Sequence, residues 1–223
     1  MGKKNIVLTF DDACKSHLYF VLPILQKYGF GATFFISRPQ SWLEKDPAAY
    51  LSGEEIAKIH QAGFEIGNHT LNHPGMGVLS DDECRREVQS LNEWLAGFGI
   101  FETVSFAYPG GPYAANAAKL LPEFGLRCAR TTEHGVWDLR ETDPMRVPCF
   151  AITDKDEANF SAALALACED ENIAPVILYH GVPDAAHPWC NTSEETFVRH
   201  MEFLAENGFK VMSMGDFQQK SIK

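Results

Sequence analysis

A repeating unit constrains the fold of this chain more than any other feature of its sequence: an amphipathic helix, a glycine, then a short apolar strand. In the last unit, Phe197, Met201 and Leu204 recur at helical spacing, and Gly208 follows where a left-handed residue ends a helix. This pattern is typical of βαβ units with a parallel sheet. We predict helices over residues 21–28, 54–61, 88–95, 117–124 and 195–206, and strands over residues 32–36, 64–66, 103–107, 126–130 and 209–212.

Such alternation fits either an open doubly wound sheet or a closed barrel. No GxGxxG follows the first predicted strand, residues 6–10 (IVLTF), which ends in Asp11 and Asp12. The main support for a dinucleotide-binding sheet is therefore missing, and we predict a barrel. A chain of 223 residues that is 45% hydrophobic can bury a full core, and no linker is visible, so we expect one domain over residues 1–223.

The two aspartates and a histidine pair carry the chemistry. Carboxylates at the carboxyl ends of strands are where α/β folds place their active sites, although an isolated Asp-Asp is more often part of a turn. His69 and His73 also follow a short apolar segment, and Pro74 disfavours a helix there, so we place both on one tight loop. One carboxylate and two imidazoles form a three-ligand set for a divalent metal ion, and the second carboxylate is left to act as a base.

A third segment of the sequence supplies a candidate general acid. His180 ends the apolar run of residues 176–179 (VILY), again at the end of a predicted strand. Hydrolysis of an acetamide needs an activated nucleophile, stabilisation of the negative charge on the intermediate, and a proton for the departing amine. An imidazole gives a proton readily near neutral pH, so His180 suits the third task.

Four ordered motifs resemble the polysaccharide deacetylases of the NodB-homology type, carbohydrate esterase family 4. They are TFDDA from residue 9, NHTLNHP from residue 68, FAYPGG from residue 106 and ILYH from residue 177. The resemblance covers residues 6 to about 217 and implies an irregular (β/α)7 barrel, similar to a TIM barrel, with the metal at the carboxyl-terminal mouth of its strands.

The resemblance also implies roles for individual residues. Asp11 would be the general base and His180 the general acid, and the Gly110 N–H would bind the oxyanion. The metal ligands would be Asp12, His69 and His73. We expect zinc from this ligand set, although cobalt, nickel, manganese or iron could occupy it.

Two motifs depart from the family pattern. Many members have an arginine in the third motif where this chain has Ala107, which leaves the orientation of Asp11 unexplained. The Asp-Trp pair of the fourth motif has no match, since residues 136–138 (VWD) carry these residue types in reverse order. Arg130, Asp143 and Arg146 are candidates to orient or tune His180, and we choose Arg146, although surface charge is at least as good an explanation of all of them.

The predicted function is metal-dependent removal of an N-acetyl group from a sugar or polysaccharide. Hydrolysis of a small non-sugar amide or cyclic imide would use the same groups, and a non-catalytic carbohydrate-binding relative is a third hypothesis. Tyr108, Tyr113 and Trp189 could stack on a sugar ring, although such residues more often pack loops; Trp189 is our preferred substrate contact.

Charge and cysteine content exclude other classes. A net charge of −11 argues against nucleic acids and anionic membranes as partners. Six cysteines without a CxxC pair indicate free thiols, and Cys14 is expected to be an inert turn residue. Without an apolar run of 18 residues or a signal-type segment we expect a cytoplasmic protein, although a processed mature chain would look the same. The oligomeric state is not predicted.

Overall fold

A curled parallel sheet forms the centre of the molecule. The computed structural model describes residues 4–222, and every pairing in this sheet is parallel, in the order β5-β4-β3-β2-β1-β9-β7, with β10 beside β1. The strands are β1 (Asn5–Phe10), β2 (Thr33–Ile36), β3 (Glu65–Asn68), β4 (Ser105–Ala107), β5 (Cys128–Arg130), β7 (Phe150–Ala151), β9 (Val176–Tyr179) and β10 (Lys210–Met212).

The two edges of this sheet approach each other through one segment. Val147 forms a parallel bridge with Arg130 at the end of β5, and a few residues later β7 pairs with β9. Residues 147–151 thus span from one edge of the sheet to the other, which curls it into a barrel. The prediction of an irregular (β/α)7 barrel is confirmed.

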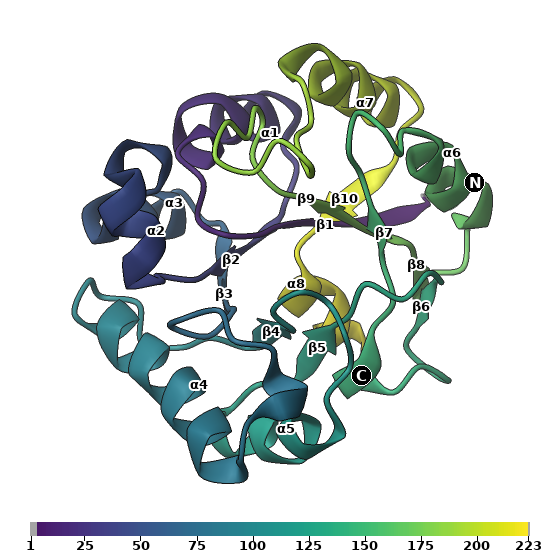
Figure 1. Cartoon of the computed structure of the whole chain (residues 1–223). Coiled ribbons are helices and arrows are strands. Elements are labelled where there is room, and N and C mark those ends of the chain that lie inside the picture. Colours follow the sequence, from purple (N-terminus) through teal and green to yellow (C-terminus); the bar gives the residue numbers. More distant parts are fainter. Residues whose placement is uncertain (1–3, 223) are drawn as a thin grey trace.

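Helices surround the sheet, as Figure 1 shows. Each predicted helix is present, but α4 begins seven residues earlier than expected, because Ser80 and Glu83 form a capping box before its polar first turn. Gly29, with φ of 66°, ends α1 in the left-handed conformation. The predicted helices are α1 (Leu22–Tyr28), α3 (Gly53–Gln61), α4 (Asp81–Ala96), α5 (Ala115–Leu120) and α7 (Glu194–Glu206).

Several elements were not predicted. The longer ones are α2 (Gln40–Lys45), α6 (Ala158–Leu166), α8 (Met214–Gln218) and an antiparallel pair of β6 (Trp137–Asp138) with β8 (Ile173–Ala174). Single helical turns are η1 (His17–Val21), η2 (Pro47–Ala49), η3 (Met76–Val78), η5 (Pro144–Arg146) and η6 (Gln219–Ile222), whereas η4 (Leu121–Phe124) lies within the helix predicted over residues 117–124. Most are too short for a periodic apolar pattern to reveal them.

The side chains of β1 alternate between two buried clusters. Ile6, Leu8 and Phe10 pack with the apolar faces of surrounding helices, whereas Val7 packs with Phe35 and other residues in a second cluster. A strand that is buried on both faces reads as a continuous apolar run, which is the pattern of residues 6–10. Within residues 4–222, no helix combines the length and apolar content needed to cross a membrane.

Candidate active site

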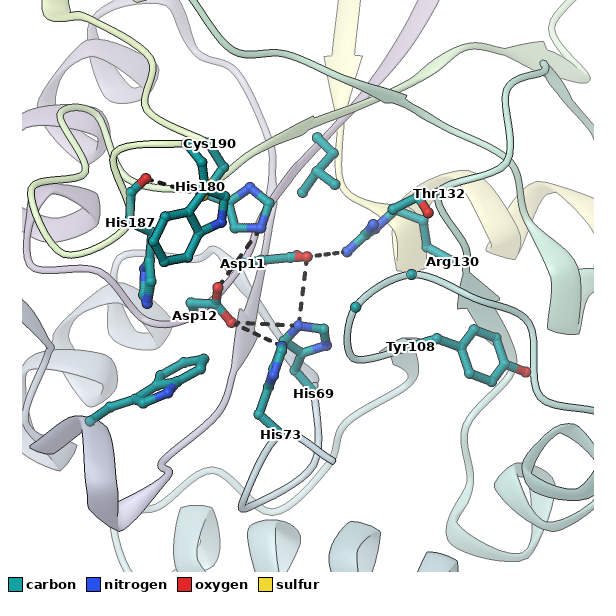
Figure 2. Close-up of a pocket in the computed structure, with 15 residues that line it drawn as sticks. Asp11, Asp12, His69, His73, Tyr108, Arg130, Thr132, His180, His187 and Cys190 are labelled. Atoms are coloured by element: carbon teal, nitrogen blue, oxygen red, sulfur yellow. Dashed lines mark hydrogen bonds and ion pairs between the residues drawn. The ribbon is translucent and has the colours of Figure 1, made fainter. Parts of the chain in front are cut away.

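The parallel strands bring the sequence-predicted residues to one mouth of the barrel. Asp11 and Asp12 follow β1, His69 follows β3 and His180 follows β9, so residues far apart in the chain converge in Figure 2. Asp12 Oδ1 lies 3.6 Å from His69 Nε2 and 3.5 Å from His73 Nε2. Carboxyl ends of parallel strands share one edge, which is the physical reason for this convergence.

Backbone strain accompanies the convergence. Asp12 and His73 adopt positive φ angles of 73° and 57°, as do their neighbours Ala13 and Thr70. Residues other than glycine rarely occupy this region, and such strain, roughly 1–3 kcal/mol for each residue, is concentrated at functional sites. The Thr70 hydroxyl accepts a hydrogen bond from the His73 N–H at 3.1 Å and holds the loop. The loop geometry predicted for the histidine pair is confirmed.

The two imidazoles present free nitrogens to Asp12. His69 Nδ1 lies 2.7 Å from the Ala107 carbonyl, to which it can only donate, so His69 Nε2 is the nitrogen that can bind an ion. Burial, together with the neighbouring His69, lowers the pKa of His73 to about 4, so this ring is neutral at neutral pH. Both side chains therefore offer lone pairs.

Asp12 Oδ1 is buried and has no hydrogen-bond partner among the described residues. An unpaired buried carboxylate oxygen is costly, and here it faces one ring nitrogen of His69 and one of His73. Asp12, His69 and His73 together can each offer one ligand atom to a single ion. The donor set and the unpaired oxygen fit a divalent metal ion at this position.

Arg130 holds the other aspartate. Its fully buried guanidinium donates from Nη2 to Asp11 Oδ2 at 2.5 Å, and it lies over the ring of Phe35. Burial raises the pKa of Asp11, but the charge of Arg130, aided by His69 and His180, outweighs burial and holds this pKa below its usual value. Among the described residues, Asp11 Oδ1 has no hydrogen-bond partner, and Asp11 lines the cavity.

The register of the sheet explains how Arg130 reaches this position. Arg130 at the end of β5 is the register partner of Ala107 on β4, the position where the family resemblance expects an arginine. Neighbouring residues in register project from the same face of a sheet. A guanidinium from the adjacent strand therefore replaces the one that Ala107 cannot supply, although the sequence suggested Arg130 only as a partner for His180.

The choice of Arg146 was wrong. Its half-exposed guanidinium forms two hydrogen bonds with Glu133, at 2.7 and 2.8 Å, on the surface. Asp143 accepts a hydrogen bond from the Met145 N–H and caps η5, and the Trp137 side chain packs on Phe217. Proximity to a predicted strand did not tell which side each side chain would face.

His180 stands across from the histidine pair. Its Nε2 lies 3.8 Å from Asp12 Oδ2, and its carbonyl accepts a hydrogen bond from His17 Nε2 at 3.0 Å. His17 is buried, which lowers its pKa to about 4, so it anchors the backbone as a neutral ring. This hydrogen bond fixes the main chain of His180, the predicted general acid.

Both aspartates, the histidine pair, Arg130 and His180 line one cavity of about 280 Å³. Gly110, with φ of 70°, and the exposed Trp189 line it as predicted. Tyr108 also lines the cavity, but its side chain is buried, and its hydroxyl donates to the Met145 carbonyl at 2.9 Å and points away from Asp12 and the histidine pair in Figure 2. Four further lining residues, Trp42, Thr132, His187 and Cys190, were not among the predicted site residues.

Comparisons with known proteins agree with this geometry. The family model for polysaccharide deacetylase matches residues 1–129. The chain is 26% identical over 134 residues to a putative polysaccharide deacetylase, YxkH, of Bacillus subtilis, covering 60% of this chain and 47% of that protein. It is 30% identical over 125 residues to a peptidoglycan-N-acetylglucosamine deacetylase of Bacillus cereus, covering 55% and 42%. The chain thus spans about half the length of these curated relatives.

A chitooligosaccharide deacetylase of Rhizobium leguminosarum bv. trifolii is 25% identical over 181 residues, covering 81% of this chain and 73% of that protein. Among solved structures, a CE4 family pseudoenzyme from Bacillus anthracis has a TM-score of 0.65 at 24% identity, covering 97% of this chain and 66% of that one. The peptidoglycan deacetylase PdaC from Bacillus subtilis has a TM-score of 0.64 at 19% identity, covering 97% and 91%. With its barrel, its motifs and the matched family model, this chain belongs to the polysaccharide deacetylase family.

Proposed function

We propose that this chain is a metal-dependent hydrolase that removes the N-acetyl group from an N-acetylated sugar or polysaccharide. One observation carries the proposal. The unpaired, buried Oδ1 of Asp12 faces His69 and His73, and beside it Arg130 keeps Asp11 ionised. A ligand set next to an oriented base is what metal-assisted hydrolysis requires.

Asp12, His69 and His73 would hold the ion. When bound, a divalent ion supplies a Lewis acid for the acetyl carbonyl and makes a nearby water more acidic. Two histidines and one carboxylate suit zinc, and cobalt, nickel, manganese or iron fit the same donors, since selectivity follows availability as well as ligand type.

Asp11 would act as the general base. Its Oδ2 is occupied by Arg130, so its free Oδ1 takes a proton from the water whose oxygen bonds to the acetyl carbon. The buried guanidinium of Arg130 fixes the orientation of the Asp11 carboxylate, and so of Oδ1, and keeps this carboxylate charged. Arg130 is therefore a positioning residue in this mechanism.

Gly110 and His180 would complete the reaction. The Gly110 backbone at the cavity wall donates its N–H to the carbonyl oxygen as negative charge develops there. His180, on the opposite wall, gives a proton to the amine nitrogen as the carbon–nitrogen bond breaks. The products are acetate and a free amino sugar.

The names of the relatives and the wall of the cavity support a sugar as the substrate. Trp189 and Trp42 line the cavity mouth, and aromatic faces of this kind stack on sugar rings. The names printed for relatives include deacetylases of chitooligosaccharide and of peptidoglycan N-acetylglucosamine. A small non-sugar amide or cyclic imide is the alternative substrate for the same groups.

Acetate release from N-acetylglucosamine oligomers, measured with and without added zinc or cobalt, tests the proposal. We expect release that depends on the metal and stops on chelation. If the protein hydrolyses small amides or cyclic imides but releases no acetate from any oligomer, its substrate is a small non-sugar amide and not an acetylated sugar. A chain that binds oligomers but hydrolyses none of these compounds with metal present would be a non-catalytic relative, like the pseudoenzyme among its structural neighbours.

A further inference from the structure

A second cluster of ligand-type side chains lies next to the first. Cys14, Asp184 and His187 are all buried, with exposed fractions of 4%, 4% and 8%. Cys14 follows β1 by four residues, whereas the other two belong to the loop after β9. One sulfur, one carboxylate oxygen and one ring nitrogen from these residues all lie within 4.8 Å of one another.

We propose that Cys14 Sγ, Asp184 Oδ2 and His187 Nδ1 form a second metal site, which binds zinc independently of the Asp12, His69 and His73 centre. The separations support a tetrahedral ion. Asp184 Oδ2 lies 3.5 Å from Cys14 Sγ and 3.3 Å from His187 Nδ1. Bond lengths of about 2.3 Å to sulfur and about 2.0 Å to oxygen or nitrogen give tetrahedral edges of roughly 3.5 and 3.3 Å.

The surroundings supply the outer hydrogen bonds that such a site needs. His187 Nε2 lies 3.2 Å from the Tyr50 hydroxyl, which accepts the ring N–H when the other nitrogen binds an ion. Asp184 Oδ1 accepts from the His187 N–H at 2.8 Å, which fixes the direction of the carboxylate. A thiolate and a carboxylate would together neutralise the charge of a buried divalent ion.

Without an ion the cluster forms hydrogen bonds among its own members. The Cys14 thiol donates to Asp184, and burial together with that carboxylate raises the pKa of Cys14 well above its usual value. Zinc must displace the thiol proton and the proton on His187 Nδ1, as structural zinc sites generally do. The ion can enter from the cavity, because His187 forms part of its wall.

The second metal site would connect the turn after β1 with the loop after β9, which forms one wall of the active-site cavity. Cys14 is two residues from Asp12, and the loop that carries Asp184 and His187 also carries Trp189 and Cys190, which line the cavity. Figure 2 shows His187 and Cys190 on the side of the cavity occupied by His180. An ion shared between the two segments would fix this wall, with a water as fourth ligand.

Cobalt titration of the metal-stripped full chain tests the site without reference to activity. A thiolate bound to cobalt gives an intense near-ultraviolet charge-transfer band, which the Asp/His/His centre cannot produce. We expect the band in the wild type and in His69→Ala, its loss in Cys14→Ser, and its retention in the matched control Cys190→Ser. Zinc content should be two per chain in the wild type and one in Cys14→Ser or in His69→Ala.

Absence of the band in the wild type, or its persistence in Cys14→Ser, would overturn the proposal and leave a hydrogen-bonded cluster. If Cys14→Ser fails to fold, His187→Gln replaces it, and an unchanged band and zinc content in that variant would equally overturn the site. Neither result depends on the proposed deacetylation, since no substrate is present.

Discussion

The two polar clusters beside the cavity differ in how well the protein alone satisfies them. In the first, Asp12 Oδ1 is buried without a hydrogen-bond partner, on a backbone with a positive φ angle. In the second, both oxygens of Asp184 accept hydrogen bonds, from the loop backbone and from neighbouring side chains. Burial of polar groups is tolerated when they are paired, so an unpaired, strained group indicates a bound ligand more strongly than a satisfied one.

One turn after β1 serves both clusters. Asp12 and Ala13, both with positive φ, reverse the chain so that Asp12 faces His69 and His73, while Cys14 faces Asp184 on the other side. A bridge between Cys14 and Tyr50 holds the end of the turn. Residues only two positions apart can therefore face separate clusters when the backbone between them adopts positive φ angles.

Removal of a proposed catalytic ligand should have the largest effect. His69→Ala should abolish detectable acetate release and remove one metal ion per chain, because the remaining two ligands hold an ion weakly. The far-ultraviolet circular dichroism spectrum should stay unchanged, since a catalytic ion is not needed for folding. Loss of the folded spectrum in His69→Ala would make the first cluster structural and break the contrast.

Asp11→Asn should separate catalysis from metal binding. We expect turnover to fall by about 100- to 10,000-fold, the range for a positioned general base, with metal content preserved. Elemental analysis of the variant decides the assignment. A matching loss of metal would make Asp11 a fourth ligand of the first cluster.

Arg130→Met removes the partner of Asp11 and should act on stability and pH dependence together. Breaking a buried ion pair costs about 3–5 kcal/mol of the free energy of unfolding. Burial then raises the pKa of Asp11 against only the weaker effects of His69 and His180, so the acidic limb of the kcat/KM profile should move to higher pH, since the base must be ionised.

Arg146→Met is the matched control for Arg130→Met. The half-exposed pair of Arg146 with Glu133 contributes about 0–1 kcal/mol, and the control should leave the pH profile unchanged. An equal shift of the acidic limb in both variants would show that general surface charge, not the buried guanidinium, sets the ionisation of Asp11.

Glu55→Gln should have a smaller effect than Arg130→Met, and it removes the carboxylate that pairs with Lys15, three residues after Asp12. Burial raises the pKa of Glu55, but hydrogen bonds from Lys15, the Ser52 N–H and Tyr19 outweigh it and lower this pKa to about 2. The stabilisation, about 1–2 kcal/mol after allowance for solvent screening, is fully present above the usual glutamate pKa and is lost as pH falls towards 2. Unfolding by urea should show a clearly larger difference between variant and wild type at pH 7 than at pH 2.5.

The sequence predicted the first half of the barrel better than the second. Apart from α2 and the short helical turns, the helices and strands up to Arg130 follow the repeating unit, and their positions agree with the structure within a few residues except at the start of α4. From residue 131 to 175 the strands are two residues long and no repeating unit is visible, so neither β7 nor α6 was predicted. Short strands carry too few side chains for alternation to stand out.

The order of apolar runs and the residues that end them were determined by the sequence alone. It placed Asp11, Asp12, His69 and His180 at strand ends, because burial of apolar segments and termination by polar residues are local properties. Only the tertiary structure decided that Arg130 and not Arg146 reaches the site, and that Cys14 meets Asp184. Those contacts depend on sheet register and on closure of the barrel, which set the direction of a side chain through pairings with residues distant in the chain.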